Sequence, residues 1–285
     1  MVDYTKSALF IEHPDKWLER LHLSPEIRVY EGEVKEYNAS FGEMRICAKP
    51  SGYVEFAGSI HKYFTGNSNA TNFNAKEVAL CVRELGEALQ IDINSARLLN
   101  LEFGVNQQLP VAAKYLLRRA VLFGNNDFSS RRTFGGKGCQ LDAEQQRYTF
   151  KAYDKAAQMH IREHLLRMEI RVTRMIHLSP AKLTTLADLV YPSSLAPLGG
   201  MLVKAWDNIL FCDPAIKLAG LPKPRRDLLT NGQSPAYWAS LKPANFRKQR
   251  AQFREWTALY SADPLPAIVR GELAATWARL LAGKA

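Results

Sequence analysis

Acidic, basic and tyrosine side chains alternate with apolar ones along four short segments of the sequence. Successive side chains of a strand point to opposite faces of a sheet, so each segment predicts a strand with one apolar and one polar face. The polar sets are Tyr53 and Glu55; Glu102 and Asn106; Lys151, Tyr153 and Lys155; and Arg167, Glu169 and Arg171. If the four strands share one sheet, these side chains share one surface.

This combination of residue types suits phosphodiester chemistry. The carboxylates of Glu55, Glu102 and Glu169 are suited to holding Mg²⁺ or Mn²⁺, and the surrounding Lys and Arg side chains to holding a phosphate. Tyr153 beside a metal-bound phosphate is a candidate nucleophile, and a nearby lysine lowers the cost of forming its phenolate. The alternative is a solvent-facing sheet surface with ordinary cross-strand ion pairs.

The elements that must position these residues are strands alternating with helices. β-branched and aromatic residues with period-two alternation predict strands over 26–36, 43–57, 97–106, 146–155 and 165–174. Helical periodicity predicts helices over 75–90, capped by Asn74, and over 111–123. This order predicts an α+β fold, an antiparallel sheet with helices packed on one face.

Beyond Pro180 the pattern becomes helical. Helices separated by Pro and Gly are expected over 183–192, 199–212, 235–241, 243–260 and 264–283. The change predicts an α+β domain over residues 1–178, which carries the candidate catalytic residues. A basic helical region over residues 179–285 would follow it.

Charge is concentrated in that second part. The 285 residues carry a net charge of +10, and residues 217–254 alone contribute nine basic side chains against Asp227. Clustered Lys and Arg favour nucleic acid as partner, since they neutralise phosphates, with Lys248, Arg250 and Arg254 as candidate DNA contacts. A solvated basic face and a membrane surface are the other interpretations.

Several protein classes are not expected. No uncharged apolar run approaches the ~20 residues of a membrane span, and the first residues lack the features of a secretory signal. The four cysteines are far apart, which excludes a zinc ribbon, argues against a redox centre and fits a reducing cytoplasm.

Four segments together resemble the rolling-circle replication initiators, namely the trans-acting plasmid Rep proteins and the replication endonucleases of filamentous phages. They are GSIHKYFTGNSNATNF (58–73), LEFGVN (101–106), YDK (153–155) and LLRMEIRV (165–172). The likeness covers roughly residues 50–175, with a weaker echo in residues 235–241. One departure matters: many nicking enzymes use a His-hydrophobe-His metal motif, and the nearest match here is His22-Leu23-Ser24.

The resemblance implies an endonuclease that nicks one strand at an origin by metal-dependent attack of a tyrosine. It leaves a 5′-phosphotyrosine link and a free 3′ hydroxyl. Tyr153 is then the nucleophile, Glu102 and Glu169 are candidate ligands for Mg²⁺ or Mn²⁺, and Lys155 positions phosphate or assists the tyrosine. Glu55 as a further ligand is inferred from strand alternation alone. Expected DNA contacts are Lys151, Arg167, Arg171, His61 and Lys62, the last two being equally explained as loop-capping residues.

The partners implied by the resemblance are single-stranded or supercoiled origin DNA, with host helicase and polymerase, in the cytoplasm of a bacterial host. The leading alternative is a non-catalytic DNA-binding replication or copy-control protein of a mobile element. Residues 160–164 match the inverted zinc-protease motif H-x-x-E-H, so a zinc hydrolase is the second alternative.

Two smaller features have structural interpretations. FGGKG (134–138) lacks the rest of a phosphate-binding loop motif and is expected to be a hairpin loop, with Arg131, Arg132 and Lys137 as candidate DNA contacts. Tyr237 and Trp238 are expected to pack between helices rather than stack on bases.

Overall fold

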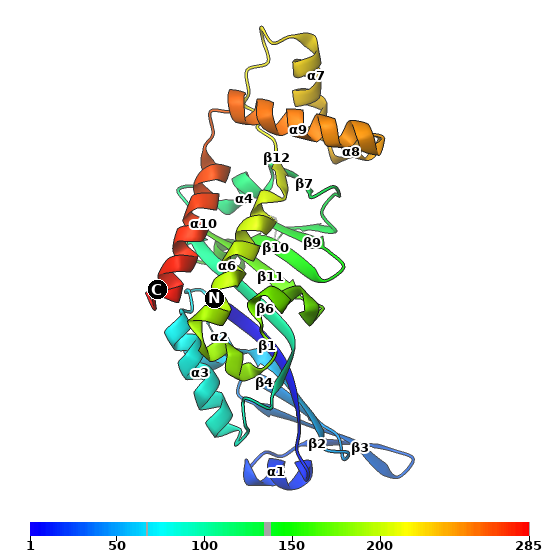
Figure 1. The fold of residues 1–285 in the computed structure, drawn as a ribbon, viewed down its shortest axis with the longest axis vertical. Helices are drawn as coiled ribbons and strands as arrows, with labels where there is room; N and C mark the ends of the chain where they lie inside the picture. Colours follow the sequence, from blue (N-terminus) through cyan, green and yellow to red (C-terminus); the bar gives the residue numbers. More distant parts are fainter. Residues whose placement is uncertain (67, 134–137, 285) are drawn as a thin grey trace.

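One antiparallel sheet runs through the middle of the molecule in the computed structural model, which describes residues 1–66, 68–133 and 138–284 (Figure 1). Among these residues it has ten strands, in the order β2-β3-β4-β5-β1-β6-β11-β10-β9-β8, and all neighbours are antiparallel. The strands are β1 (Val2–Phe10), β2 (Glu26–Tyr30), β3 (Glu33–Phe41), β4 (Met44–Ala48), β5 (Tyr53–Ser59), β6 (Arg97–Gln108), β8 (Ser130–Arg132), β9 (Gln140–Glu144), β10 (Tyr148–Asp154) and β11 (Leu165–Val172).

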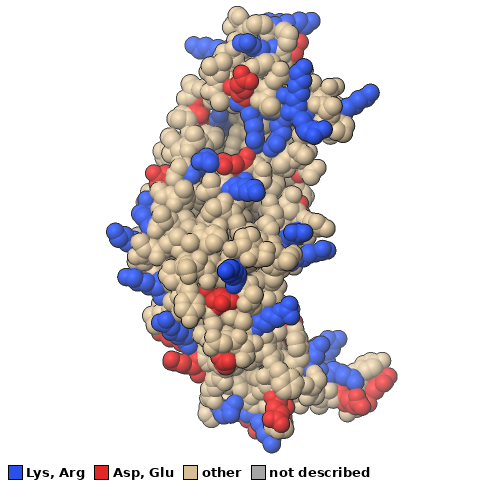
Figure 2. All heavy atoms as spheres, in the orientation of Figure 1, with Lys and Arg blue, Asp and Glu red and all other residues tan. Residues whose placement is uncertain are grey.

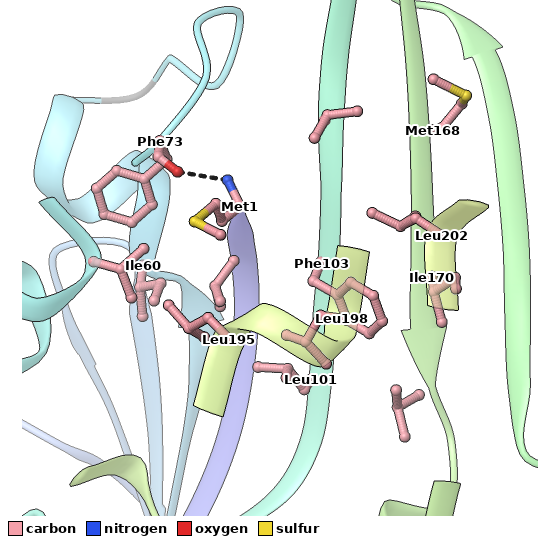
Figure 3. Close-up of a cluster of buried hydrophobic side chains, with 14 of the residues drawn as sticks. Met1, Ile60, Phe73, Leu101, Phe103, Met168, Ile170, Leu195, Leu198 and Leu202 are labelled. Carbon is pink, nitrogen blue, oxygen red and sulfur yellow. Dashed lines mark hydrogen bonds between the residues drawn. The ribbon is translucent and has the colours of Figure 1, made fainter. Parts of the chain in front are cut away.

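Three long helices cover the apolar face of this sheet: α3 (Ala75–Ala88), α6 (Pro192–Asp207) and α10 (Leu265–Leu281). Figure 3 shows leucines of α6 lying against apolar side chains of β6 and β11. Asn74 caps α3 as expected, since its side chain accepts the backbone N–H of Glu77 and the Glu77 carboxylate accepts that of Asn74. The predicted α+β class, with a helical C-terminal part, is confirmed.

The remaining elements correct several boundaries. The segments 26–36 and 43–57 each span two strands rather than one, because tight turns interrupt them; in the first, Glu31 and Gly32 have positive φ. The expected helix over 111–123 is short α4 (Ala113–Leu117) followed by β7 (Ala120–Phe123), and β7 pairs with β12 (Ile209–Phe211). The short helices are α1 (Pro14–Arg20), α2 (Ile60–Thr65), α5 (Lys155–Met159), η1 (Met175–Ala181) and η2 (Leu186–Val190).

Apolar packing does not divide at residue 178. Helices α6 and α10 belong to the same hydrophobic core as the sheet, although both lie beyond that residue. A second core joins the β7–β12 pair to a lobe that we define as α7 (Lys223–Asn231), α8 (Pro235–Ala239) and α9 (Pro243–Tyr260). The lobe stands at one end of the elongated molecule, and the β2–β3 hairpin projects at the other (Figure 1). Pro and Gly breaks mark where helices end, and they do not show which core a helix joins.

None of the helices in the described ranges is long and apolar enough to span a membrane.

Trp277 tests whether α10 is an integral part of the main core. Its ring is 3% exposed, packs edge-on against Phe103 and lies where any side chain at Gly199 would clash. We expect Trp277→Ala to lower the free energy of unfolding by about 3–5 kcal/mol. On the same helix, Ile268 is 49% exposed, and Ile268→Ala should change stability by less than about 0.5 kcal/mol. Urea unfolding of both variants measures this, and similar values for the two would contradict the assignment.

Candidate active site

A group of polar side chains lies near the centre of the sheet, on the face opposite α6 and α10. We call it the polar cluster: Asp3 (β1), Glu102 (β6), Lys151 and Tyr153 (β10), and Arg167 and Glu169 (β11). The strand register creates it, since Lys151 lies opposite Glu169 and Tyr153 opposite Arg167. Sheet alternation thus brings together the tyrosine and two of the three carboxylates expected from the sequence.

Lys151 joins the two glutamates. Its Nζ lies 3.1 Å from Oε1 of Glu102 and 3.1 Å from Oε1 of Glu169. Burial and the Glu169 carboxylate together raise the pKa of Glu102 to about 8. Burial alone would lower the pKa of Lys151, but the two carboxylates keep it above its ordinary value. Two carboxylates have therefore been placed close together, and an internal ammonium offsets their repulsion.

Tyr153 donates its hydroxyl to Oε2 of Glu169 at 3.3 Å and is 6% exposed. Burial and the neighbouring Glu169 charge raise the pKa of the phenol far above its ordinary value. Tyr153 is therefore a neutral phenol that donates a hydrogen bond to a carboxylate.

Arg167 lies opposite Tyr153 on the neighbouring strand, and its guanidinium donates three side-chain hydrogen bonds. Its Nε donates to Oε2 of Glu169 at 2.6 Å and one terminal nitrogen donates to Asp3 at 2.6 Å. The other terminal nitrogen donates to the side-chain oxygen of Asn106 at 3.1 Å. Burial alone would raise the pKa of Glu169, but the guanidinium holds it well below its usual range. At 3% exposed, Arg167 is an internal ion-pair residue, and the expectation that it contacts DNA is wrong.

Asp3 is the member of the cluster that sequence reasoning missed. The register of β1 against β6 shifts between Val2 and Tyr4, and this irregularity places the Asp3 carboxylate with the polar cluster. Ser59 and Asn69 also donate to it, at 2.6 Å and 2.9 Å. No strand is predicted from the sequence before residue 26, so neither β1 nor its Asp3 was expected at the site.

Lys155 lies at the start of α5, where Asp154 caps the helix by accepting the N–H of Ala157 at 3.0 Å. Its Nζ lies 5.8 Å from the centre of the Tyr153 ring and donates to Asn69 at 2.7 Å. Burial and the nearby Arg167 charge lower the pKa of Lys155 to about 8. The amine of Lys155 thus lies close to the Tyr153 ring.

The donors of the cluster fit a small divalent cation. Mg²⁺ is typically held by one or two carboxylates, with waters and substrate phosphate completing its shell. Glu102 and Glu169 supply the two carboxylates, both within 3.1 Å of the Lys151 ammonium. Gly104 keeps the space open, because a Cβ on it would lie 2.7 Å from the Cβ of Glu169. In the described ranges no group of three or more His, Cys, Asp or Glu side chains gathers around one point.

Glu55 lies apart from the cluster. Its carboxylate pairs with Lys6 at 2.7 Å and accepts the Tyr53 hydroxyl at 2.9 Å. Glu55 is opposite Ala8 on β1, whereas Glu102 is opposite Tyr4; four residues along a strand is about 13 Å. The structure therefore does not bring the expected third ligand to the other two.

Three further predicted DNA contacts, His61, Lys62 and Arg171, differ in how exposed they are. His61 is 2% exposed and stacked on Phe73 with ring centres 4.7 Å apart, so it is a packing residue and the predicted DNA contact is wrong. Lys62 remains partly exposed at the edge of a cavity described below. Arg171 is exposed on β11, opposite Glu102.

The H-x-x-E-H match is not a helical zinc motif. Helix α5 ends at Met159, and His160 has φ of 55°. His160 and His164 therefore do not lie one turn apart on a helix, which is the arrangement the motif needs. The zinc interpretation is wrong because the segment turns towards β11 before a second helical turn forms.

Basic side chains gather around the lobe, where Figure 2 shows blue side chains over α7–α9 and just beneath them. Two of the three expected DNA contacts there have structural bonds. Arg254 donates to the carbonyl oxygens of Asp207 and Ile209, and Arg250 to that of Asn208. These carbonyls lie at the C-terminal end of α6, where the helix dipole makes a positive charge favourable. Lys248 is exposed.

The smaller features are largely structural. Trp238 is buried in the lobe core and donates to the carbonyl of Gly232 at 2.8 Å, which confirms its predicted packing role. Arg131 pairs with Asp127 at 2.7 Å and donates to two carbonyls of β7. The FGGKG loop, including Lys137, lies outside the described residues except for Gly138. Tyr148, on the apolar face of β10, stacks on His177 and is absent from the polar cluster.

Comparison with solved structures finds a similarity to a rolling circle replication initiator protein from Geobacillus stearothermophilus. The sequences are 16% identical, the TM-score is 0.40, and the match covers 79% of this chain and 90% of that chain. No protein-family model matches the chain, and no curated protein matches it.

Arg167 and Arg171 lie on the same strand, β11, but Arg167 is buried and Arg171 is exposed. Their substitutions should therefore have different effects on stability. Arg167→Ala would leave Asp3 buried without its cation and Glu169 with Lys151 as its remaining one, so we expect a loss of about 3–5 kcal/mol in the free energy of unfolding. Arg171→Ala, two residues away on an exposed position, should cost less than about 0.5 kcal/mol. Chemical denaturation of both variants measures the difference. A small cost for Arg167→Ala would show that the cluster does not depend on it.

Proposed function

We propose that this chain is a DNA replication initiator that nicks one strand at an origin by transesterification on Tyr153. The observation that carries the proposal is the 3.3 Å contact between the Tyr153 hydroxyl and the Glu169 carboxylate, within a cluster that also offers cations for a phosphate. A nucleophile, a proton acceptor and phosphate-binding groups are the minimum set for this reaction.

The residues would divide the work as follows. Oε2 of Glu169 takes the phenol proton as the Tyr153 oxygen attacks phosphorus. The bond from phosphorus to the 3′ oxygen breaks, and the proton passes to that oxygen, which leaves as a free hydroxyl. A 5′-phosphotyrosine link remains, and no proton is gained or lost overall. Lys151 and Lys155 offset the charge on the phosphate oxygens, and Arg167 keeps Glu169 ionised and fixed.

Glu102 and Glu169 are the residues that would hold Mg²⁺ or Mn²⁺. A divalent cation there would polarise the phosphodiester and stabilise the negative charge of the transition state. Lys151 occupies the space between the two carboxylates, so its side chain has to move aside, towards the phosphate, when a cation is held.

The lobe would bind the DNA backbone. Lys242, Arg247 and Lys248 are exposed there, and Lys and Arg on a surface bind DNA through phosphates without reading sequence. The implied partners are single-stranded or supercoiled origin DNA in the bacterial cytoplasm, with host helicase and polymerase acting on the nicked product.

Tyr153→Phe removes only the reacting oxygen and keeps the ring. We expect the wild-type chain to form an SDS-resistant adduct with a 3′-labelled pool of random single-stranded 30-mers in Mg²⁺ or Mn²⁺, and none in chelator. The variant should form no adduct under any condition, because no other group forms the phosphotyrosine bond.

Tyr148→Phe is the matched control, since Tyr148 lies on the opposite face of the same strand; it should keep the adduct. An undiminished adduct in Tyr153→Phe would overturn the assignment. DNA binding by the wild type without any adduct would instead identify the non-catalytic replication or copy-control protein.

The proposed binding of DNA phosphates by the lobe can be tested by how the binding constant depends on salt concentration. We expect Arg247→Ala combined with Lys248→Ala to weaken binding to a labelled duplex of arbitrary sequence and to reduce the slope of log K against log salt by about 1.8, since each lost phosphate contact removes about 0.9. Lys16→Ala with Arg20→Ala removes the same charge from α1, far from the lobe, and should leave the slope unchanged (Figure 1). Equal slopes in the two double variants would place the DNA contact elsewhere.

A further inference from the structure

A second concave surface lies on the same polar face of the sheet, beside the polar cluster. It is a cavity of about 510 Å³ formed by β1, β3, β4, β5 and α2. Its lining includes the polar side chains of Tyr4, Lys6, Arg45, Glu55, Ser59 and Lys62. The volume is that of a pocket for one small molecule, about 300–1,000 Å³.

The strand register explains why this part of the face is hollow. Ala57 on β5 lies directly opposite Lys6 on one neighbouring strand and directly opposite Arg45 on the other. The small side chain of Ala57 thus lies between the long basic side chains of Lys6 and Arg45. The bottom of the cavity is therefore formed by a small residue, and its sides carry positive charge. Ser59 adds a second small residue to this strand, opposite Tyr4.

The cavity adjoins the polar cluster directly. Ser59, which lines the cavity, donates to Asp3 of the cluster at 2.6 Å. Tyr4, which also lines the cavity, is the cross-strand neighbour of Glu102. The two surfaces are therefore consecutive parts of one polar face.

Its charge suits an anionic chain. Lys6 is paired with Glu55 at 2.7 Å, so these two charges offset each other. Within the described ranges neither Arg45 nor Lys62 takes part in an ion pair, and Glu43 is the other acidic side chain of the lining. A cavity with two unpaired cations, one aromatic ring and a small-residue floor matches the requirements of single-stranded nucleic acid, which are backbone cations and a stacking surface.

We propose that this cavity binds single-stranded DNA of the same strand that presents its scissile phosphate to Tyr153. The inference rests on the proposed nicking function and names the path of its substrate. Arg45 and Lys62 bind phosphates, and the Tyr4 ring supports a base. A single strand presents unpaired bases to the Tyr4 ring, whereas the bases of a duplex are paired and stacked on one another. Arg45 lies three strands from Glu102 and five from Tyr153 in the sheet order.

At about 4.8 Å per strand this spans about 14–24 Å, or about four to seven nucleotides at the ~3.4 Å rise of stacked bases. The length of the bound DNA is therefore a measurable consequence. Wild-type affinity for fluorescein-labelled oligo(dT) should rise steeply between 4 and 12 nucleotides, as one strand reaches both surfaces.

The test compares Arg45→Ala combined with Lys62→Ala against the charge-matched control Lys16→Ala combined with Arg20→Ala. Anisotropy titrations use oligo(dT) of 4, 8, 12 and 16 nucleotides at several salt concentrations. For the 12-mer and 16-mer, we expect the cavity variant to lose the length-dependent gain and to lower the salt slope by about 1.4, since each single-strand phosphate contact contributes about 0.7. Tyr4→Ala should weaken binding about tenfold, and Tyr4→Phe should restore it.

The outcomes separate the two proposals. If the wild-type chain forms the Tyr153 adduct but the cavity variant keeps the salt slope and length dependence of the control, the cavity proposal is overturned and nicking stands. If no adduct forms with any DNA while the cavity variant loses slope and length dependence, nicking fails and the cavity stands as a single-strand site.

Discussion

The guanidinium of Arg167 is the interaction on which the site depends. It is buried in the central strand β11 and bonded to Asp3 at one end and to Glu169 at the other. Charges buried in a protein are tolerated only when they are paired and hydrogen-bonded. Arg167 meets that condition for two carboxylates at once, so β1 and β11 are tied together across β6 by side chains as well as by the backbone ladder.

Much of this site was predictable from alternation, and the exceptions have physical causes. Glu102, Tyr153 and Glu169 share a face because a strand has an exact period of two, and the sequence shows that period without ambiguity. Asp3 was missed because its strand β1 was not predicted, and the pairing of that strand with β6 is what brings Asp3 to the site. Glu55 has the right face, but a pattern does not show how far along a neighbouring strand a residue will lie.

The charge of the chain is less available to DNA than the sequence suggests. Arg250 and Arg254 bond carbonyls near the end of α6, and Arg167 is enclosed in the sheet. Composition shows how many cations a segment carries, whereas their use depends on which carbonyls and carboxylates the fold brings within reach. The exposed cations, by contrast, lie on surfaces where a phosphate backbone can approach.

In the proposed function, the electrostatics of the cluster would link the activation of Tyr153 to the binding of the substrate phosphate. Burial and Glu169 keep Tyr153 protonated, and burial and Glu169 also raise the pKa of Glu102 to about 8. At neutral pH the ionised members of the cluster are then Asp3 and Glu169 against Arg167 and Lys151, and the amine of Lys155 beside them adds a small excess of positive charge. In the proposed function, this excess of positive charge would attract a phosphate. The bound phosphate would engage the two lysines and leave Glu169 as the nearest proton acceptor, so that the phenol would lose its proton only as its oxygen bonds to phosphorus.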